Sequence, residues 1–167
     1  MTHRVKPAGL WLLVASLAVA LAACGNAGNE TTGNAQTAAP SEPSFKDFGD
    51  YEVHYNAVRS DILTAEVAHA YGIERSANRV LLNVSLLRKG ADGRTSPVDG
   101  TVTATAYNLN GQLKSLEVRR ITEGTSIYFI GEVGISGSEI LVFNIDATPA
   151  DAGTKYSVQF KREFFAD

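Results

Sequence analysis

The sequence predicts an all-β protein whose fold is an immunoglobulin-like antiparallel β-sandwich of about seven strands, with one short helix between the first two strands. The first observation is a hydrophobic period of two residues. It is clearest near the C-terminus, where alternate residues form one largely apolar face and the residues between them form a polar face. The first face carries Tyr156, Val158, Phe160, Arg162 and Phe164. The second is the close spacing of turn sequences between apolar runs, which is typical of antiparallel hairpins. Parallel strands would need connections of about a dozen residues or more.

The remaining strands follow in chain order. Residues 51–56, 101–106 and 141–145 each place apolar side chains at alternate positions. Residues 79–87 are instead almost continuously apolar, so we expect this strand at the centre of a sheet, buried on both faces. The turns between strands are predicted at Asp92-Gly93, Asn110-Gly111, Glu123-Gly124 and Gly134 to Gly137.

One segment has the composition of a helix. Residues 62–71 are rich in good helix formers such as alanine and glutamate. Thr64 is placed to cap the N-terminus of this helix, and Gly72 is placed to end it. The sequence therefore predicts a short helix that connects the first strand to the second.

The N-terminal segment has the three parts of a bacterial lipoprotein signal. Basic residues precede an apolar stretch at residues 10–20, which is short for a spanning helix of about 20 apolar residues. The tetrapeptide Leu21-Ala22-Ala23-Cys24 follows and resembles a lipobox, whose cysteine is acylated. We therefore expect residues 1–23 to be a cleaved signal peptide and Cys24 to carry the lipid. An ordinary secretory peptide cut at Ala20-Leu21-Ala22 is the alternative.

Composition changes sharply after this cysteine. Residues 25–44 are small and polar, so they bury too little apolar surface to offset the entropy lost on ordering. We expect residues 24–44 to be the lipidated cysteine and a flexible tether, and residues 45–167 to be the folded domain. Gly25 stands where an aspartate commonly retains Gram-negative lipoproteins at the inner membrane. This favours the outer membrane, with the domain facing the periplasm.

The charge balance bears on the partners. The chain has 15 Lys and Arg residues and 18 Asp and Glu residues. Removal of Arg4 and Lys6 with the signal peptide leaves 13 basic against 18 acidic residues, a formal charge of −5. Nucleic acid is therefore not an expected partner. The expected partners are the membrane, through the lipid on Cys24, and another envelope protein or a cell-wall component.

His54 is one candidate for chemistry. It lies on the polar face of the first predicted strand, between Glu52 and Asn56. A hydrolase or a metal-dependent enzyme could use it together with nearby acids. A hydrogen bond from His54 to a neighbour on the strand is the simpler interpretation. The sequence has no recognisable catalytic motif, and it predicts no cofactor and no metal site.

A second candidate is a group of polar residues between the predicted helix and the next strand, namely Tyr71, Arg75, Asn78 and Arg79. Loops on a rigid sandwich often carry function, and arginine holds anionic groups through paired donors, so this group is a candidate binding site. The alternative is structural, with the two arginines neutralising Glu74 and Glu66 and binding carbonyl groups at the helix end.

Three aromatic motifs resemble a family of proteobacterial envelope proteins, domain-of-unknown-function family 4426. They are Phe48-Gly49-Asp50-Tyr51-Glu52-Val53-His54-Tyr55-Asn56-Ala57, Ala70-Tyr71-Gly72-Ile73 through Asn78, and Gln159-Phe160 through Glu163-Phe164-Phe165. The resemblance implies a Gram-negative host and brings no assigned reaction and no catalytic residue. The lipobox and tether depart from the plain secretory peptides of the family. We therefore expect a membrane-anchored envelope lipoprotein that acts as a non-catalytic binding or structural module.

Overall fold

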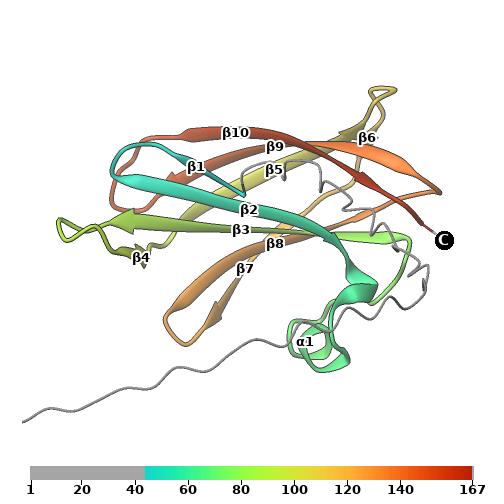
Figure 1. Cartoon of the computed structure of the whole chain (residues 1–167), viewed down its shortest axis with the longest axis horizontal. Helices are drawn as coiled ribbons and strands as arrows, with labels where there is room; N and C mark the ends of the chain where they lie inside the picture. Colours follow the sequence, from blue (N-terminus) through green and yellow to red (C-terminus); the bar gives the residue numbers. More distant parts are fainter. Residues whose placement is uncertain (1–43, 167) are drawn as a thin grey trace, which may run out of the picture. The chain divides into compact units, whose positions relative to one another are not determined.

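The computed structural model describes residues 44–166, which form two antiparallel sheets packed face to face (Figure 1). The predicted signal peptide, Cys24 and the tether up to residue 43 lie outside the described residues. The larger sheet has the order β1-β2-β3-β8-β7, with β4 paired to the end of β3, and its strands are β1 (Phe45–Asp47), β2 (Tyr51–Arg59), β3 (Arg79–Lys89), β4 (Thr95–Pro97), β7 (Val118–Glu123) and β8 (Ser126–Gly134). The smaller sheet has the order β10-β9-β5-β6, with β5 (Gly100–Asn108), β6 (Leu113–Lys114), β9 (Glu139–Pro149) and β10 (Tyr156–Phe164).

The predicted all-β, antiparallel class is confirmed, but the strand number is wrong. Residues 44–166 contain ten strands where the sequence predicted about seven. Three of the ten, β1, β4 and β6, are only two or three residues long. An alternating pattern cannot be recognised in so few residues, which is why the prediction missed them. The other seven strands have six to eleven residues each.

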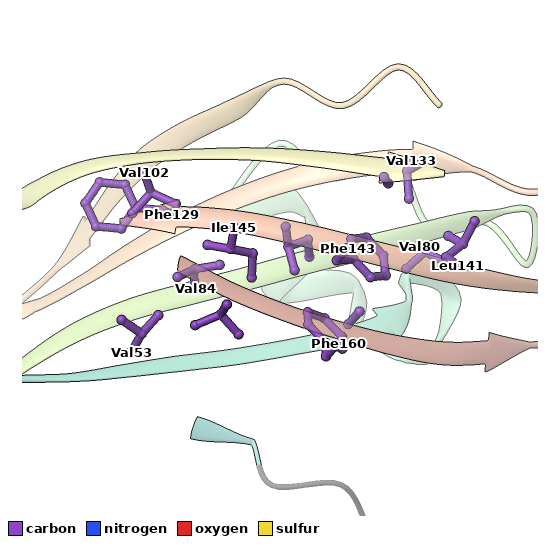
Figure 2. Packing of buried hydrophobic residues seen from close by; sticks show 14 of the residues in the cluster. Val53, Val80, Val84, Val102, Phe129, Val133, Leu141, Phe143, Ile145 and Phe160 are labelled. Atoms are coloured by element: carbon purple, nitrogen blue, oxygen red, sulfur yellow. The ribbon is translucent and has the colours of Figure 1, made fainter. Parts of the chain in front are cut away.

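The main core lies between the inner faces of the two sheets. The larger sheet contributes Val53 and Val84, and the smaller sheet contributes Phe143, Ile145 and Phe160 (Figure 2). Val53, Phe143, Ile145 and Phe160 occupy the alternate apolar positions from which their strands were predicted, whereas Val84 belongs to the strand predicted from a continuous apolar run. Full burial of a side chain of this kind stabilises the fold by about 1.5 to 3 kcal/mol. The period of two is therefore confirmed as the inward-facing side of each sheet.

Strand β3 lies at the centre of the larger sheet and is buried on both faces, as its continuous apolar run predicts. Leu82 points into the main core, whereas Leu81 lies on the outer face. A second, smaller apolar cluster covers Leu81 there and includes Ile130 of β8 together with Ala68 and Ile73. The segment between β2 and β3 thus lies over the outer face of the larger sheet.

This covering segment contains a 3₁₀ turn, η1 (Ser60–Ile62), and the helix α1 (Ala65–Ala70). The hydroxyl of Thr64 accepts a hydrogen bond from the Val67 N–H at 3.2 Å, and Gly72 has a φ of +60° just past the helix. The predicted cap and stop are therefore confirmed. Ser60 is fully buried, and its hydroxyl donates to the Glu74 carbonyl at 2.6 Å, which joins the two ends of the segment.

No helix within residues 44–166 is both long enough and apolar enough to cross a membrane.

Candidate functional site

The outer face of the larger sheet has a hollow beside α1, which we call the α1 hollow. Its volume is about 290 Å³. One wall is the covering segment, with Val67, Tyr71 and Ile73, and the floor is the sheet, with side chains that include Leu81, Ile121, Tyr128 and Ile130. The lining is mainly apolar, since several of its side chains belong to the small apolar cluster that holds α1 to the sheet. This cluster does not fill the space between α1 and the sheet.

Two polar groups of the α1 hollow stand out. The hydroxyl of Tyr71 is hydrogen-bonded to the Glu123 carboxylate, and this bond together with burial raises the pKa of Tyr71 above its ordinary value. Arg119 donates to the Tyr71 carbonyl and holds that residue at the wall. Asn83 also lines the hollow, and its Oδ1 is buried without a hydrogen-bond partner among residues 44–166. A buried acceptor without a partner is costly, so a donor that reached this atom would be favoured.

A second hollow lies beside the first on the same face, and Asn83 borders both. We call it the His54 hollow. Its volume is about 270 Å³, and its lining is polar, with Ser44, His54, Tyr55, Asn56, Asn83 and Ser85. The pairing of β2 with β3 produces this grouping, because Asn56 lies opposite Asn83 and His54 lies opposite Ser85.

His54 is hydrogen-bonded to its strand neighbour. Its Nε2 lies 2.7 Å from Oε2 of Glu52, and its ring stacks on Phe45 with 5.1 Å between ring centroids. Lys89 lies 3.7 Å from the other oxygen of Glu52 and also contacts Asp47. A lysine among these acids supplies positive charge where a metal ion would sit. Among the described residues, no three His, Cys, Asp or Glu side chains form a group that could hold a metal ion.

The residues of the second candidate group do not converge on one site. Tyr71 lines the α1 hollow, whereas Arg75 donates to the Asp61 carbonyl at 2.9 Å. Arg79 pairs with Glu74 at 3.0 Å and approaches Glu132 at 3.8 Å. The backbone of Asn78 is also engaged, since its N–H donates to the Ser76 hydroxyl and its carbonyl accepts from Ile135. These arginines bind a carbonyl group and pair with acids, as the structural alternative describes. A binding role for the four residues stays a prediction.

Sequence reasoning missed the floor of the α1 hollow. Ile121, Glu123 and Tyr128 come from the β7–β8 hairpin and reach Asn83 only through the pairing of β3 with β8. One signal was present, because Asn83 interrupts an apolar run in the strand predicted to be most buried. A polar side chain at such a position needs a partner or a function.

The domain is shared with known proteins. The family described as "Domain of unknown function (DUF4426)" matches residues 45–167. The chain belongs to the DUF4426 family. A crystal structure of a DUF4426 family protein from Pseudomonas aeruginosa PAO1 is similar at 36% sequence identity and a TM-score of 0.63, covering 74% of this chain and 94% of that one. The resemblance inferred from the aromatic motifs is confirmed.

A second solved structure shares the fold alone. It is FetP of uropathogenic E. coli strain F11, recombinantly expressed in the periplasm of E. coli BL21(DE3). Its sequence identity is 12% and its TM-score 0.50, with 72% of this chain and 92% of that chain covered. Among curated proteins, none matches the chain. The DUF4426 family carries no assigned function.

Proposed function

We propose that this DUF4426 protein is a lipid-anchored binding module of the bacterial envelope, and that the α1 hollow is its binding site. The observation that carries the proposal is the α1 hollow itself, an apolar depression bordered by Asn83, whose Oδ1 is buried and unpartnered among the described residues. Such a site binds an apolar group that also carries a hydrogen-bond donor. No catalytic step is part of the proposal.

The volume of the α1 hollow limits the size of the group that it can bind. A volume of about 290 Å³ lies just below the range of about 300 to 1,000 Å³ typical of small-molecule sites. A single ring or a short side chain therefore fits. This suits a larger partner, an envelope protein or a cell-wall component, that inserts one group and lies with its remainder along the polar His54 hollow.

The location rests on the N-terminal sequence. Basic residues, a short apolar stretch and the Leu21-Ala22-Ala23-Cys24 tetrapeptide support cleavage before Cys24 and acylation of its thiol. Lipoproteins carry more than one acyl chain, and each buried methylene contributes about 0.8 kcal/mol, so the attachment would be stable. Gly25 supports the outer membrane, with the domain in the periplasm.

Strand order supports a finer description of the fold. Lettered A to G in chain order, the seven long strands lie in the orders A-B-E-D in the larger sheet and G-F-C in the smaller. These are the strand orders of constant-type immunoglobulin domains, so we propose this topology for the sandwich. An experimental structure with strands paired in another order would contradict it.

The test of the binding site uses a photoreactive amino acid in place of Tyr71, in the full chain expressed in Gram-negative cells. We expect a crosslinked adduct whose mass identifies the partner. Val67→Trp adds bulk at the mouth of the α1 hollow and should abolish the adduct. Glu66→Trp is the matched control, because Glu66 is an exposed neighbour on α1 that does not line the hollow. The proposal fails if no adduct forms, or if Val67→Trp and Glu66→Trp give equal adducts.

A further inference from the structure

We propose that one end of the sandwich rests on the lipid bilayer through four exposed apolar side chains, Ile62, Leu109, Leu113 and Phe165, here called the apolar rim. The inference rests on the proposed lipid anchor and goes beyond it, because it assigns a surface of the domain to the membrane. The surface is separate from the α1 hollow.

The members of the apolar rim are unusually exposed for their size. Their exposed fractions are 65% for Ile62, 66% for Leu109, 70% for Leu113 and 57% for Phe165. Single exposed apolar residues are normal on a protein surface, but a group of them marks an interaction surface. Ile62, Leu109 and Phe165 come shortly after β2, β5 and β10, which end on the same side of the sandwich. Leu113 begins β6 and is paired with Tyr107 near the end of β5.

Hydrogen bonds and ion pairs connect the elements of the rim from one to the next. Glu139 accepts from Lys114 of the β5–β6 hairpin and from the Ser136 N–H of the β8–β9 loop. The carbonyl of Gly137 in that loop accepts from the Ala166 N–H at 3.3 Å, beside Phe165. Arg59 then donates to the Phe165 carbonyl and pairs with Asp61, next to Ile62. These contacts connect the elements that carry the four apolar residues at one end of the sandwich.

The hairpin that carries Leu109 and Leu113 is held in place by side-chain hydrogen bonds and an ion pair. Asn108 is buried, and its Oδ1 accepts from the backbone N–H groups of Asn110 and Gln112 at 3.1 and 3.0 Å. Lys114 pairs with Glu139 at 2.8 Å, and each of these two side chains is only 13% exposed. A buried polar network of this kind fixes the backbone, so the leucines are held in solvent by the structure.

The β5–β6 hairpin and the adjacent loop carry no charge of their own. Residues 108–113 of the hairpin and residues 134–138 of the adjacent loop contain no charged side chain. Lys114 pairs with Glu139 and Arg59 pairs with Asp61, whereas Glu163, close to Phe165, is exposed. Because a charge is costly to remove from water, the hairpin and the loop can approach acyl chains at a smaller cost than the charged faces.

The direction of the chain points the rim toward the anchor. Strand β1 is antiparallel to β2, so Ser44, the first described residue, lies beyond the start of β1 in the direction in which β2 runs toward Arg59. Figure 1 shows that this is the side of the β5–β6 hairpin and the C-terminal end. The 20 residues between Cys24 and Phe45 have a coil reach of roughly 25 Å. A tether of that length keeps the rim within reach of the bilayer, which is why we assign the rim to lipid and not to a protein.

The test places a tryptophan at the rim. The only tryptophan of the chain is Trp11 in the predicted signal peptide, so an introduced one is the sole reporter in the mature protein. Leu113→Trp is compared with Arg94→Trp, which lies at the opposite end in the turn between β3 and β4. Both lipoproteins are purified with their lipid and inserted into vesicles of phosphatidylethanolamine and phosphatidylglycerol, with and without brominated acyl chains.

We expect the emission of Leu113→Trp to shift to shorter wavelength and to be quenched by the brominated lipid, with no such changes for Arg94→Trp. Equal behaviour of the two variants in an acylated protein overturns the rim while leaving the anchor intact. The same result would turn attention to a protein partner for the hairpin. The intact mass of each sample separates the two ideas, because a protein without added acyl mass refutes the anchor and the rim together.

Discussion

Replacement of Asn83 by leucine should stabilise the domain while removing the hydrogen-bonding group of the α1 hollow. Asn83 lies on the central strand β3, opposite Asn56 of β2 and Ile130 of β8. A buried polar group without a partner costs about 1 to 3 kcal/mol. Because the Asn83 side chain as a whole is only partly buried, we place the gain at about 1 kcal/mol, the lower end of that range. Leucine has the same branching and the same number of heavy atoms, and its larger methyl groups can extend into the adjoining α1 hollow.

The assay is urea and thermal unfolding of the purified protein. A gain of about 1 kcal/mol corresponds to a rise in Tm of about 3 to 6 °C for a domain of this size. Asn56→Leu is the matched control, because Asn56 is exposed and its Oδ1 accepts from Arg162. That change removes a formed bond and should lower stability or leave it unchanged. If Asn83→Leu lowers stability as much as Asn56→Leu does, the reasoning about the unpartnered oxygen is refuted.

Three further predictions concern the ion pair, the histidine and the helix cap. Burial raises the pKa of Glu139, but hydrogen bonds from Lys114, Asn108 and the Ser136 N–H outweigh it and hold the pKa below its ordinary value of 4.5. The stability that ionised Glu139 contributes is therefore complete above pH 4.5 and is lost as the pH falls through the lowered pKa. Glu139→Gln should therefore reduce the decline of the unfolding free energy in acid. An unchanged decline would contradict this prediction. His54→Ala should leave the zinc and iron content of the purified protein unchanged by elemental analysis, and metal that disappears in this variant would favour the enzyme alternative. Thr64→Ala should cost about 1 kcal/mol in urea unfolding, and an unaltered midpoint would argue against the cap.

Local pattern was sufficient to predict the class of the fold. The long strands were predictable because one face of each is buried, so a period of two is imposed on residues such as Val53 and Phe160. The helix was predictable because Thr64 and Gly72 mark its ends in sequence. The short strands β1, β4 and β6 were not, since they exist through pairing with a longer neighbour and carry no period of their own.

The candidate site was only partly predictable, for a different reason. Tyr71 was singled out from its loop, and the structure places it on the wall of the α1 hollow. Glu123 and Tyr128 became neighbours of Tyr71 through the docking of α1 on the sheet, a non-local event that no short motif encodes. Arg75 and Arg79 were predicted as candidate anion ligands, and the structure adds that one donor of Arg75 binds the Asp61 carbonyl and that Arg79 pairs with Glu74. Whether a guanidinium is engaged depends on the fold around it.

The measurement that tests the central proposal most directly is the intact mass of the native protein extracted from membranes, compared with Cys24→Ser. We predict a native polypeptide that begins at Cys24 and carries added acyl mass, and a variant that lacks this mass and leaves the membrane fraction. A native protein without added lipid, or a Cys24→Ser variant that stays equally membrane-associated, would contradict the proposal.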